Sequence, residues 1–257
     1  LTHLVRAKED KMKQFCITTA MGKRLIGQGM ARHPWVELVL EKGTLVIIAG
    51  TTNGYIAEEI LTALGQAEGF TRVGFRRGIT VAPGHKLPEA EFPGDVVIVD
   101  GQWQRGKTIF DVTNDLKPGD IVLKGANAYD PYGQAAVQIG HPQGGTVHAA
   151  LAAVYGRRVQ MIVPVGLEKR VSESVLDLAR YINGPYGSGV RLYPIPGDIF
   201  TELDAIELLT GAEAHLVAAG GIYGAEGSAW IAVTGSEEEE QAAEDLVRSV
   251  RNEPPCE

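Results

Sequence analysis

The chain has 257 residues and a mass of 27.5 kDa, and 24 Lys and Arg against 32 Asp and Glu give a formal net charge of −8. This balance disfavours a nucleic-acid-binding protein, because a domain that neutralises phosphates needs a positive face. A hydrophobic fraction of 44% with 22% charged residues excludes a disordered chain. At roughly 150 residues per domain, the length allows one large domain or a main domain with a small one.

The sequence gives no sign of a membrane helix, a set of disulfides or a metal site. No apolar run approaches the roughly 20 residues of a membrane helix, and residues 1–13 are too charged for a signal peptide. The two cysteines, Cys16 and Cys256, lie far apart, and no Cys or His spacing is typical of a zinc site. We therefore expect a cytoplasmic protein with no membrane or nucleic-acid partner, no metal and no cofactor.

The first half of the chain predicts alternating helices and strands. Residues 15–43 have apolar side chains at helical spacing with a break at His33–Pro34, which predicts one or two short helices. Residues 43–50 are a continuous apolar run rich in β-branched side chains, typical of a strand buried in a parallel sheet. A helical pattern then begins at Thr51.

Further strands are predicted along the middle of the chain, with a hairpin around Arg105–Gly106. A helix follows Gly144, Gly145 and Thr146. The predicted strands are 71–82, 95–103, 107–112, 120–124 and 159–166. This alternation predicts an α/β domain over residues 1–183, with an open, mostly parallel, Rossmann-like sheet and helices on both faces.

Residues 190–250 predict a small C-terminal α+β unit. The expected order is strand, helix, two strands and helix, at 190–195, 199–210, 213–219, 228–234 and 237–250, which is a split βαβ (ferredoxin-like) unit. Ser236 and Glu239 predict a capping box at the start of the last helix. The Gly- and Pro-rich segment 183–189 is the predicted linker.

Two loops place small residues and hydroxyls directly before a helix. The first loop is Gly50, Thr51, Thr52 and Asn53, and the second is Gly144, Gly145 and Thr146. Unpaired amides at a helix N-terminus attract anions, and loops at the carboxyl edge of a parallel sheet are where α/β proteins bind ligands. The alternative is that Thr52 or Asn53 caps its helix and the glycines only turn the chain. Neither loop matches a Walker or GxGxxG motif.

A third candidate segment lies between these loops. Lys124, Gly125, Asn127 and Asp130 follow a predicted strand and offer a cation, an amide and a carboxylate. The alternative is that Asn127 and Asp130 close the loop through side-chain turns.

Two further basic groups lie near these segments. His141 and His148 flank the second loop at a spacing not typical of metal ligands, and His141 is a candidate ligand donor or general acid. Gly22–Lys23–Arg24 either adds positive charge to an anion site or forms an exposed helical face, which we favour.

The order of these motifs resembles the superfamily of ribose-5-phosphate isomerase, which includes glucosamine-6-phosphate deaminase, CoA transferases and the sensor domains of DeoR-type repressors. The resemblance rests on segments 50–52, 119–130, 139–146 and 156–171 and covers about half the chain. It implies a phosphate- or CoA-binding role for the first loop, and matches the other two segments to the family's acidic and glycine-rich loops. It also implies that Lys169 contacts ligand or acidic neighbours.

The sequence departs from the isomerase at its catalytic acids. Lys124 and Asn127 stand where the resemblance implies loop carboxylates, and Ala150 stands where it implies the catalytic glutamate. Proton transfer between carbon atoms needs a carboxylate base, so we do not expect isomerase activity. His141 falls near the isomerase lysine. The candidate catalytic residues are Asp130, His141 and Lys169.

Three functions compete. The first is binding of a sugar phosphate, nucleotide, CoA ester or other anionic small molecule, by an isomerase-like or transferase-like enzyme of undetermined reaction. The second is a non-catalytic metabolite sensor or regulatory subunit of the same superfamily. The third, CoA transfer through a glutamyl ester, lacks a Glu in a matching loop. Homo-oligomer formation is a default for α/β enzymes, although no interface is visible in the sequence.

Overall fold

A computed structural model describes residues 12–78, 80–87 and 89–256. Residues 1–11, on which most of the signal-peptide prediction rests, lie outside this set. Among the described residues, no helix combines the length and apolar character needed to cross a bilayer.

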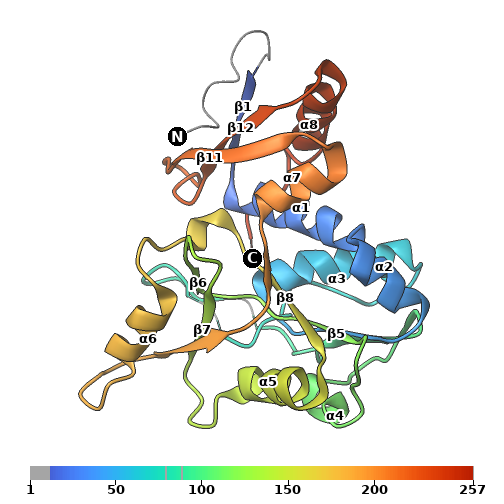
Figure 1. The fold of residues 1–257 in the computed structure, drawn as a ribbon, viewed down its shortest axis with the longest axis vertical. Coiled ribbons are helices and arrows are strands. Elements are labelled where there is room, and N and C mark those ends of the chain that lie inside the picture. Colours follow the sequence, from blue (N-terminus) through green and yellow to red (C-terminus); the bar gives the residue numbers. More distant parts are fainter. Residues whose placement is uncertain (1–11, 79, 88, 257) are drawn as a thin grey trace.

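The centre of the protein is a six-stranded mixed sheet (Figure 1). Its order is β10 (Asp198–Phe200), β8 (Gln160–Pro164), β5 (Ile121–Leu123), β2 (Thr44–Ile47), β3 (Val96–Val99) and β4 (Gln102–Trp103). The first four strands run parallel, whereas β3 and β4 are antiparallel to their neighbours. The protein is therefore a mixed α/β protein.

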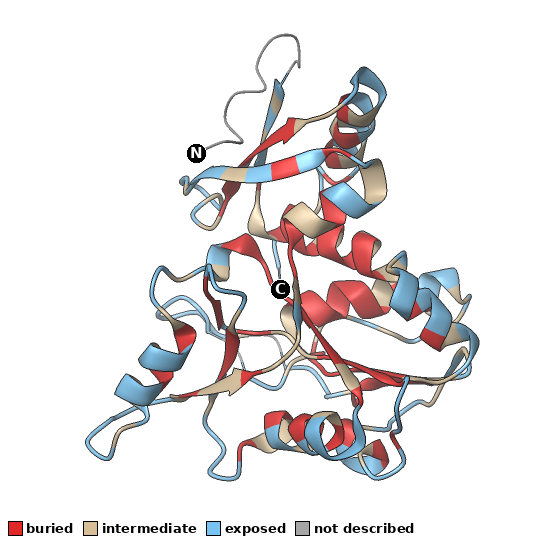
Figure 2. Cartoon of the chain, viewed as in Figure 1, coloured by how far each residue is buried: buried red, intermediate tan, exposed pale blue. Residues whose placement is uncertain are grey.

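Helices cover both faces of this sheet (Figure 1). One face carries α1 (Thr19–Ala31), α2 (Pro34–Glu41) and α3 (Thr51–Ala63), and the other carries α4 (Ile109–Val112) and α5 (Gly145–Arg157). The central strands are buried on both sides (Figure 2), as their uninterrupted apolar sequence predicts. The predicted break at His33–Pro34 is confirmed, since His33 caps α2 and Pro34 occupies its first turn.

A second, three-stranded antiparallel sheet has the order β6 (Ala128–Tyr129), β7 (Ala135–Ile139) and β9 (Arg191–Ile195). The helix α6 (Val175–Ile182) packs on it, because its Val175 and Ala179 share a cluster with Leu192. The predicted linker 183–189 therefore joins two elements that pack against each other.

The third sheet has the order β1 (Met12–Ile17), β12 (Ala229–Thr234) and β11 (Glu213–Ala219), and is covered by α7 (Glu202–Thr210) and α8 (Glu237–Ser249). The predicted capping box of Ser236 and Glu239 is confirmed. The expected composition of this sheet is wrong, because the strand predicted at 190–195 pairs with β7 instead and β1 takes the remaining place. The helical pattern expected from residue 15 begins only at Thr19, after β1.

Three local predictions are also wrong. The hairpin turns at Asp100–Gly101 rather than at Arg105–Gly106, because both central residues have positive φ, +46° and +76°, as a type I′ turn requires. Residues 109–112 form α4 instead of a strand, since Thr108 and Asp111 form a capping box. The strand expected over 71–82 is absent from its described residues, which are irregular apart from turns and bends at residues 72–74 and 77.

Candidate functional site

The carboxyl ends of the parallel strands meet at one edge of the central sheet. The chain leaves β2 into the loop before α3, leaves β5 at Lys124, and leaves β8 towards the short 3-10 helix η1 (Leu167–Lys169). Because β3 runs in the opposite direction, Asp95, which precedes it, lies at the same edge. This is the edge at which open α/β sheets bind ligands.

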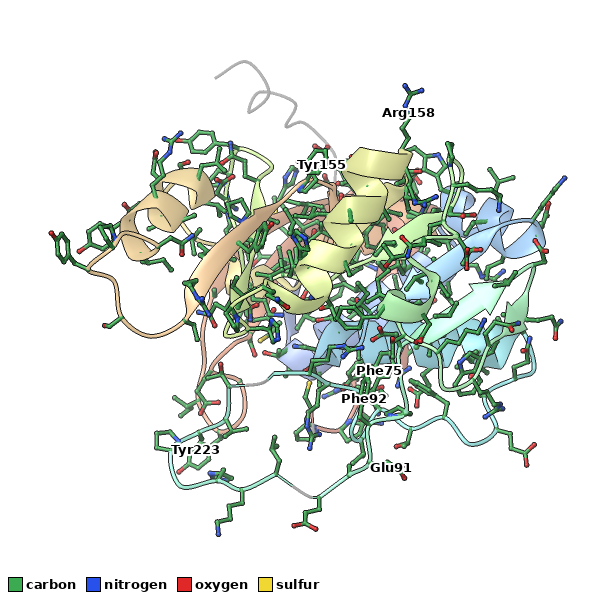
Figure 3. All side chains as sticks on the ribbon, turned by 90° about the horizontal axis from the view of Figure 1, so that it is seen from below. Phe75, Glu91, Phe92, Tyr155, Arg158 and Tyr223 are labelled. Carbon is green, nitrogen blue, oxygen red and sulfur yellow. The ribbon has the colours of Figure 1, made fainter. Side chains whose placement is uncertain are left out.

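A cavity of about 1720 Å³ opens at this edge, and we call it the edge cavity. It is larger than the roughly 300–1,000 Å³ of ordinary ligand pockets, so it has room for a ligand of nucleotide or CoA size. Its walls include the turn before α1, the N-termini of α3 and α5, and parts of segments 77–87, 223–225 and 251–256. Figure 3 shows Tyr223, one of the lining residues, on the side of the molecule opposite Tyr155 of α5 and Arg158, which follows that helix.

The first predicted loop forms one wall. Gly50 lies at the N-cap of α3, and no side chain caps the helix, so the alternative that Thr52 or Asn53 caps it is wrong. Asn53 Nδ2 donates to the carbonyls of Ile48 at 2.7 Å and Leu123 at 3.0 Å, which fixes α3 against β2 and β5. Among the described atoms, the buried Thr52 Oγ1 has no hydrogen-bond partner. Gly50, Thr51, Thr52 and Asn53 all line the cavity.

The second predicted loop forms another part of the cavity wall. Gly144 has φ +78°, and a Cβ there would lie 3.0 Å from Tyr193 Cε2, so only glycine fits without strain. No side chain caps α5, and Gly144, Gly145 and Thr146 line the cavity. His141 also lines it, and its Nδ1 accepts a hydrogen bond from the Gln143 amide at 3.1 Å.

The second loop does not follow a strand of the central sheet. The strand before the second loop, β7, belongs to the antiparallel sheet with β6 and β9. Both loops nevertheless line the same cavity, so they converge through the packing of two sheets rather than through one.

Two lysines, Lys124 and Lys169, line the same cavity as these loops. Lys124 follows β5, and its Nζ lies 3.4 Å from the carbonyl oxygen of Gly125. Burial lowers the pKa of Lys124 from 10.5 to about 8; the charge of Asp95 opposes this, and those of Lys169 and Arg77 add to it. Burial also lowers the pKa of Lys169, against the attraction of Glu168. Neither lysine forms a salt bridge with a described residue, and both line the cavity.

Lys23 was expected on an exposed face, and that expectation is wrong. It is 4% exposed, lines the cavity and lies 3.1 Å from Glu168 Oε1. The neighbouring Arg24 binds Glu58, Glu59 and Glu253. The glycines of α1 could have indicated that this helix is buried, because it packs closely against its neighbours along them. A Cβ on Gly29 would lie 2.8 Å from Ala205 Cβ.

Asp130 does not line the cavity, which corrects its candidacy as a catalytic residue. It is 2% exposed and accepts hydrogen bonds from the amides of Tyr132, Gln134 and Val175 at 2.9, 3.0 and 2.8 Å. These bonds close the β6–β7 turn and cap α6, as the side-chain-turn alternative predicts. Asn127 Oδ1 accepts from the Gln138 amide at 2.9 Å, yet Asn127 and Gly125 both line the cavity.

Sequence reasoning missed several walls of the cavity. Arg77 lies in the segment 71–82, which was predicted as a strand although Gly74 and Gly78 within it favour a loop. The C-terminal residues Arg251 and Cys256 carry no local signal at all. Within the described ranges, no three His, Cys, Asp or Glu side chains gather as a metal site requires.

Comparison of the chain with protein-family models, with curated proteins and with solved structures found no match in any of the three. The superfamily resemblance therefore stays a prediction, and the function has to be argued from the edge cavity itself.

Proposed function

We propose that this protein binds a phosphate-bearing or otherwise anionic small molecule in the edge cavity. The charge of the described lining carries this proposal: it holds six Lys and Arg side chains and a single acidic one, Glu253. Glu253 is itself bound by Arg24 and Arg72. The six are Lys23, Arg77, Lys86, Lys124, Lys169 and Arg251. Glu168 pairs with Lys23 and Asp95 pairs with Arg77, so the other four carry the local positive excess. In a chain of net charge −8, this excess concentrates positive potential where an anion would enter.

Backbone amides at two helix N-termini offer hydrogen-bond donors in addition to this positive charge. Helices α3 and α5 are 13 residues long, and no side chain caps either N-terminus in the described structure. Their first amides have no partner within their helix, and the helix dipole favours negative charge at this end. Lys124 follows β5 and lines the same cavity. The cavity lining therefore offers a phosphate group both helix N-terminal amides and a lysine cation.

We also propose a Rossmann-like arrangement for the central unit. The support is the set of four parallel strands with helices on both faces and a ligand-sized cavity at their carboxyl edge.

The second candidate function is a non-catalytic metabolite sensor. The observation in its favour is the shortage of a carboxylate base: Glu253 is the one acidic residue of the described lining and is held by two arginines. Ala150, which stands at the glutamate position of the isomerase, is buried. A sensor would gain stability from its effector and release no product on prolonged incubation.

Thermal unfolding with added anions tests the proposal. Inorganic phosphate, sugar phosphates, nucleotides and CoA esters are screened against wild type, Thr52→Val and Lys124→Ala. Thr52→Val keeps the side-chain shape, and Thr52 Oγ1 has no partner to lose among the described atoms, so folding should persist.

A ligand at about 100 times its dissociation constant adds about 3 kcal/mol of stability, which raises the melting temperature by several degrees. Both variants should reduce this rise, while Lys42→Ala, at an exposed position outside the lining, should leave it unchanged. The proposal is wrong if no anion stabilises wild type, or if both cavity variants respond as wild type does.

A further inference from the structure

Lys124 has surroundings unlike those of a lysine that only neutralises an anion. It lies in the edge cavity with no carboxylate of a described residue within salt-bridge distance. The charge that acts most strongly on Lys124 is that of Asp95, but the Asp95 carboxylate is already bound by Arg77 and by the amides of Ala49 and Ile109. Lys124 therefore has no carboxylate partner of its own, and burial rather than a neighbouring charge has the largest effect on its amine.

The other side chains of the cavity lining also disfavour a proton on Lys124. Lys169 and Arg77 are its cationic neighbours, and apolar side chains such as Ala126 and Val137 line the same cavity. Desolvation together with an adjacent cation is the arrangement that keeps a lysine amine unprotonated and nucleophilic near neutral pH. Such an amine attacks carbonyl carbon.

We propose that Lys124 forms an imine with the carbonyl carbon of the bound ligand, so that the substrate class is a phosphorylated aldehyde or ketone. The Nζ lone pair attacks the carbonyl carbon and the π electron pair moves to oxygen. Both amine protons then leave with that oxygen as water, and a C=N bond remains. No oxidant or reductant is consumed. This inference rests on the proposed anion-binding function and adds the chemistry of the ligand to it.

The test uses the wild-type protein and pyridoxal 5′-phosphate as a phosphorylated aldehyde. Sodium borohydride delivers hydride to the imine carbon and fixes the product as a secondary amine, and mass spectrometry of proteolytic peptides locates it. At neutral pH, Lys124 should be modified about tenfold more than the exposed Lys42 and Lys107, because more of its amine is unprotonated. A high concentration of inorganic phosphate should abolish this preference for Lys124. Pyridoxal, which lacks the phosphate group, should modify Lys124 no more than the exposed lysines.

Lys169 provides a matched pair of variants. Lys169→Gln removes a neighbouring cation and should move the pH profile of Lys124 modification upward from a midpoint near 8, whereas Lys169→Arg should keep it. Stabilisation by phosphate with Lys124 modified no more than Lys42 and Lys107 overturns the imine and leaves anion binding intact. Preferred modification of Lys169 also overturns the assignment to Lys124. Absence of stabilisation by any anion overturns the proposed function itself.

Discussion

The buried carboxylate of Asp95 binds the guanidinium group of Arg77, with 2.9 Å between Asp95 Oδ2 and Arg77 Nη2. The same carboxylate accepts the amides of Ala49 and Ile109, each at 2.9 Å. One side chain therefore joins the segment after β2, the loop that carries Arg77 and the start of α4. Because Ala49 directly precedes Gly50, Asp95 also fixes the first wall of the edge cavity.

Asp95→Asn should destabilise the fold and weaken ligand binding together. The amide keeps the size of the side chain but removes the charge that holds Arg77, and it turns one acceptor into a donor that faces another donor. We expect a loss of about 2–3 kcal/mol in the free energy of unfolding, measured by urea denaturation.

Asp177→Asn is the matched control, because Asp177 pairs with Arg180 on the surface, where both side chains are largely exposed. It should leave the unfolding free energy unchanged. Equal losses in the two variants would contradict the role assigned to Asp95.

Glu202→Gln should make stability less dependent on pH. Glu202 is 3% exposed and its Oε2 accepts the Leu167 amide at 3.0 Å. Burial raises its pKa from 4.5 to about 7; Glu168 adds to this, and Lys23 opposes it. The folded state therefore binds this proton more tightly than the unfolded state, and wild type loses stability as pH rises from about 4.5 to about 7.

Thermal unfolding at two pH values checks this. Wild type and Glu202→Gln should melt alike at about pH 4, and the variant should be more stable by up to about 3 kcal/mol at about pH 8. Wild type matching the variant at the higher pH would show that Glu202 ionises without cost.

Asp130→Ala should cost stability without changing ligand affinity. Three backbone amides, those of Tyr132, Gln134 and Val175, lose their acceptor, for an expected loss of about 3 kcal/mol. Calorimetric titration with the anion identified by the thermal screen should give the wild-type dissociation constant within about twofold, since Asp130 lies outside the cavity lining. A large loss of affinity in a folded variant would show that Asp130 takes part in ligand binding.

Gly144→Ala should be more destabilising than Gly145→Ala. Both glycines have positive φ, +78° and +56°, so both substitutions strain the backbone by about 1 kcal/mol or more. At Gly144 the added Cβ also lies 3.0 Å from Tyr193 Cε2 and 3.2 Å from His148 Cβ, whereas at Gly145 the nearest atom is 3.6 Å away. Urea denaturation should rank the two variants in that order, and the reverse order would mean that the α5 N-terminus rearranges.

The parts of the fold that follow from local sequence were predictable. The apolar run at 43–50 contains β2, the strand predicted near 213–219 is β11, and the last helix begins after the Ser236 cap. In each case the signal lies within about ten consecutive residues. The two anion-binding candidates were visible for the same reason, because small residues before a helical pattern are a local feature.

The parts that failed depend on contacts distant in sequence. β1 becomes a strand because β12 offers it a partner, with Phe15 opposite Ile231, and no pattern within residues 12–17 identifies that partner. The C-terminal wall of the cavity is held by Glu253 with Arg24 and Arg72. Such ion pairs depend on the completed fold, so the sequence alone could not place these residues at the site.

The pairing of β1 with β12 also sets an order of events at the ribosome. Met12 lies opposite Thr234, so β1 has no strand partner until residue 234 has been synthesised. The last strand of the central sheet, β10, ends at Phe200, so that sheet can close first. Ile17, 1% exposed in the folded protein, lies opposite Ala229 and lacks that neighbour until β12 has been synthesised. Slow synthesis therefore prolongs the interval in which a nascent chain is open to aggregation through β1.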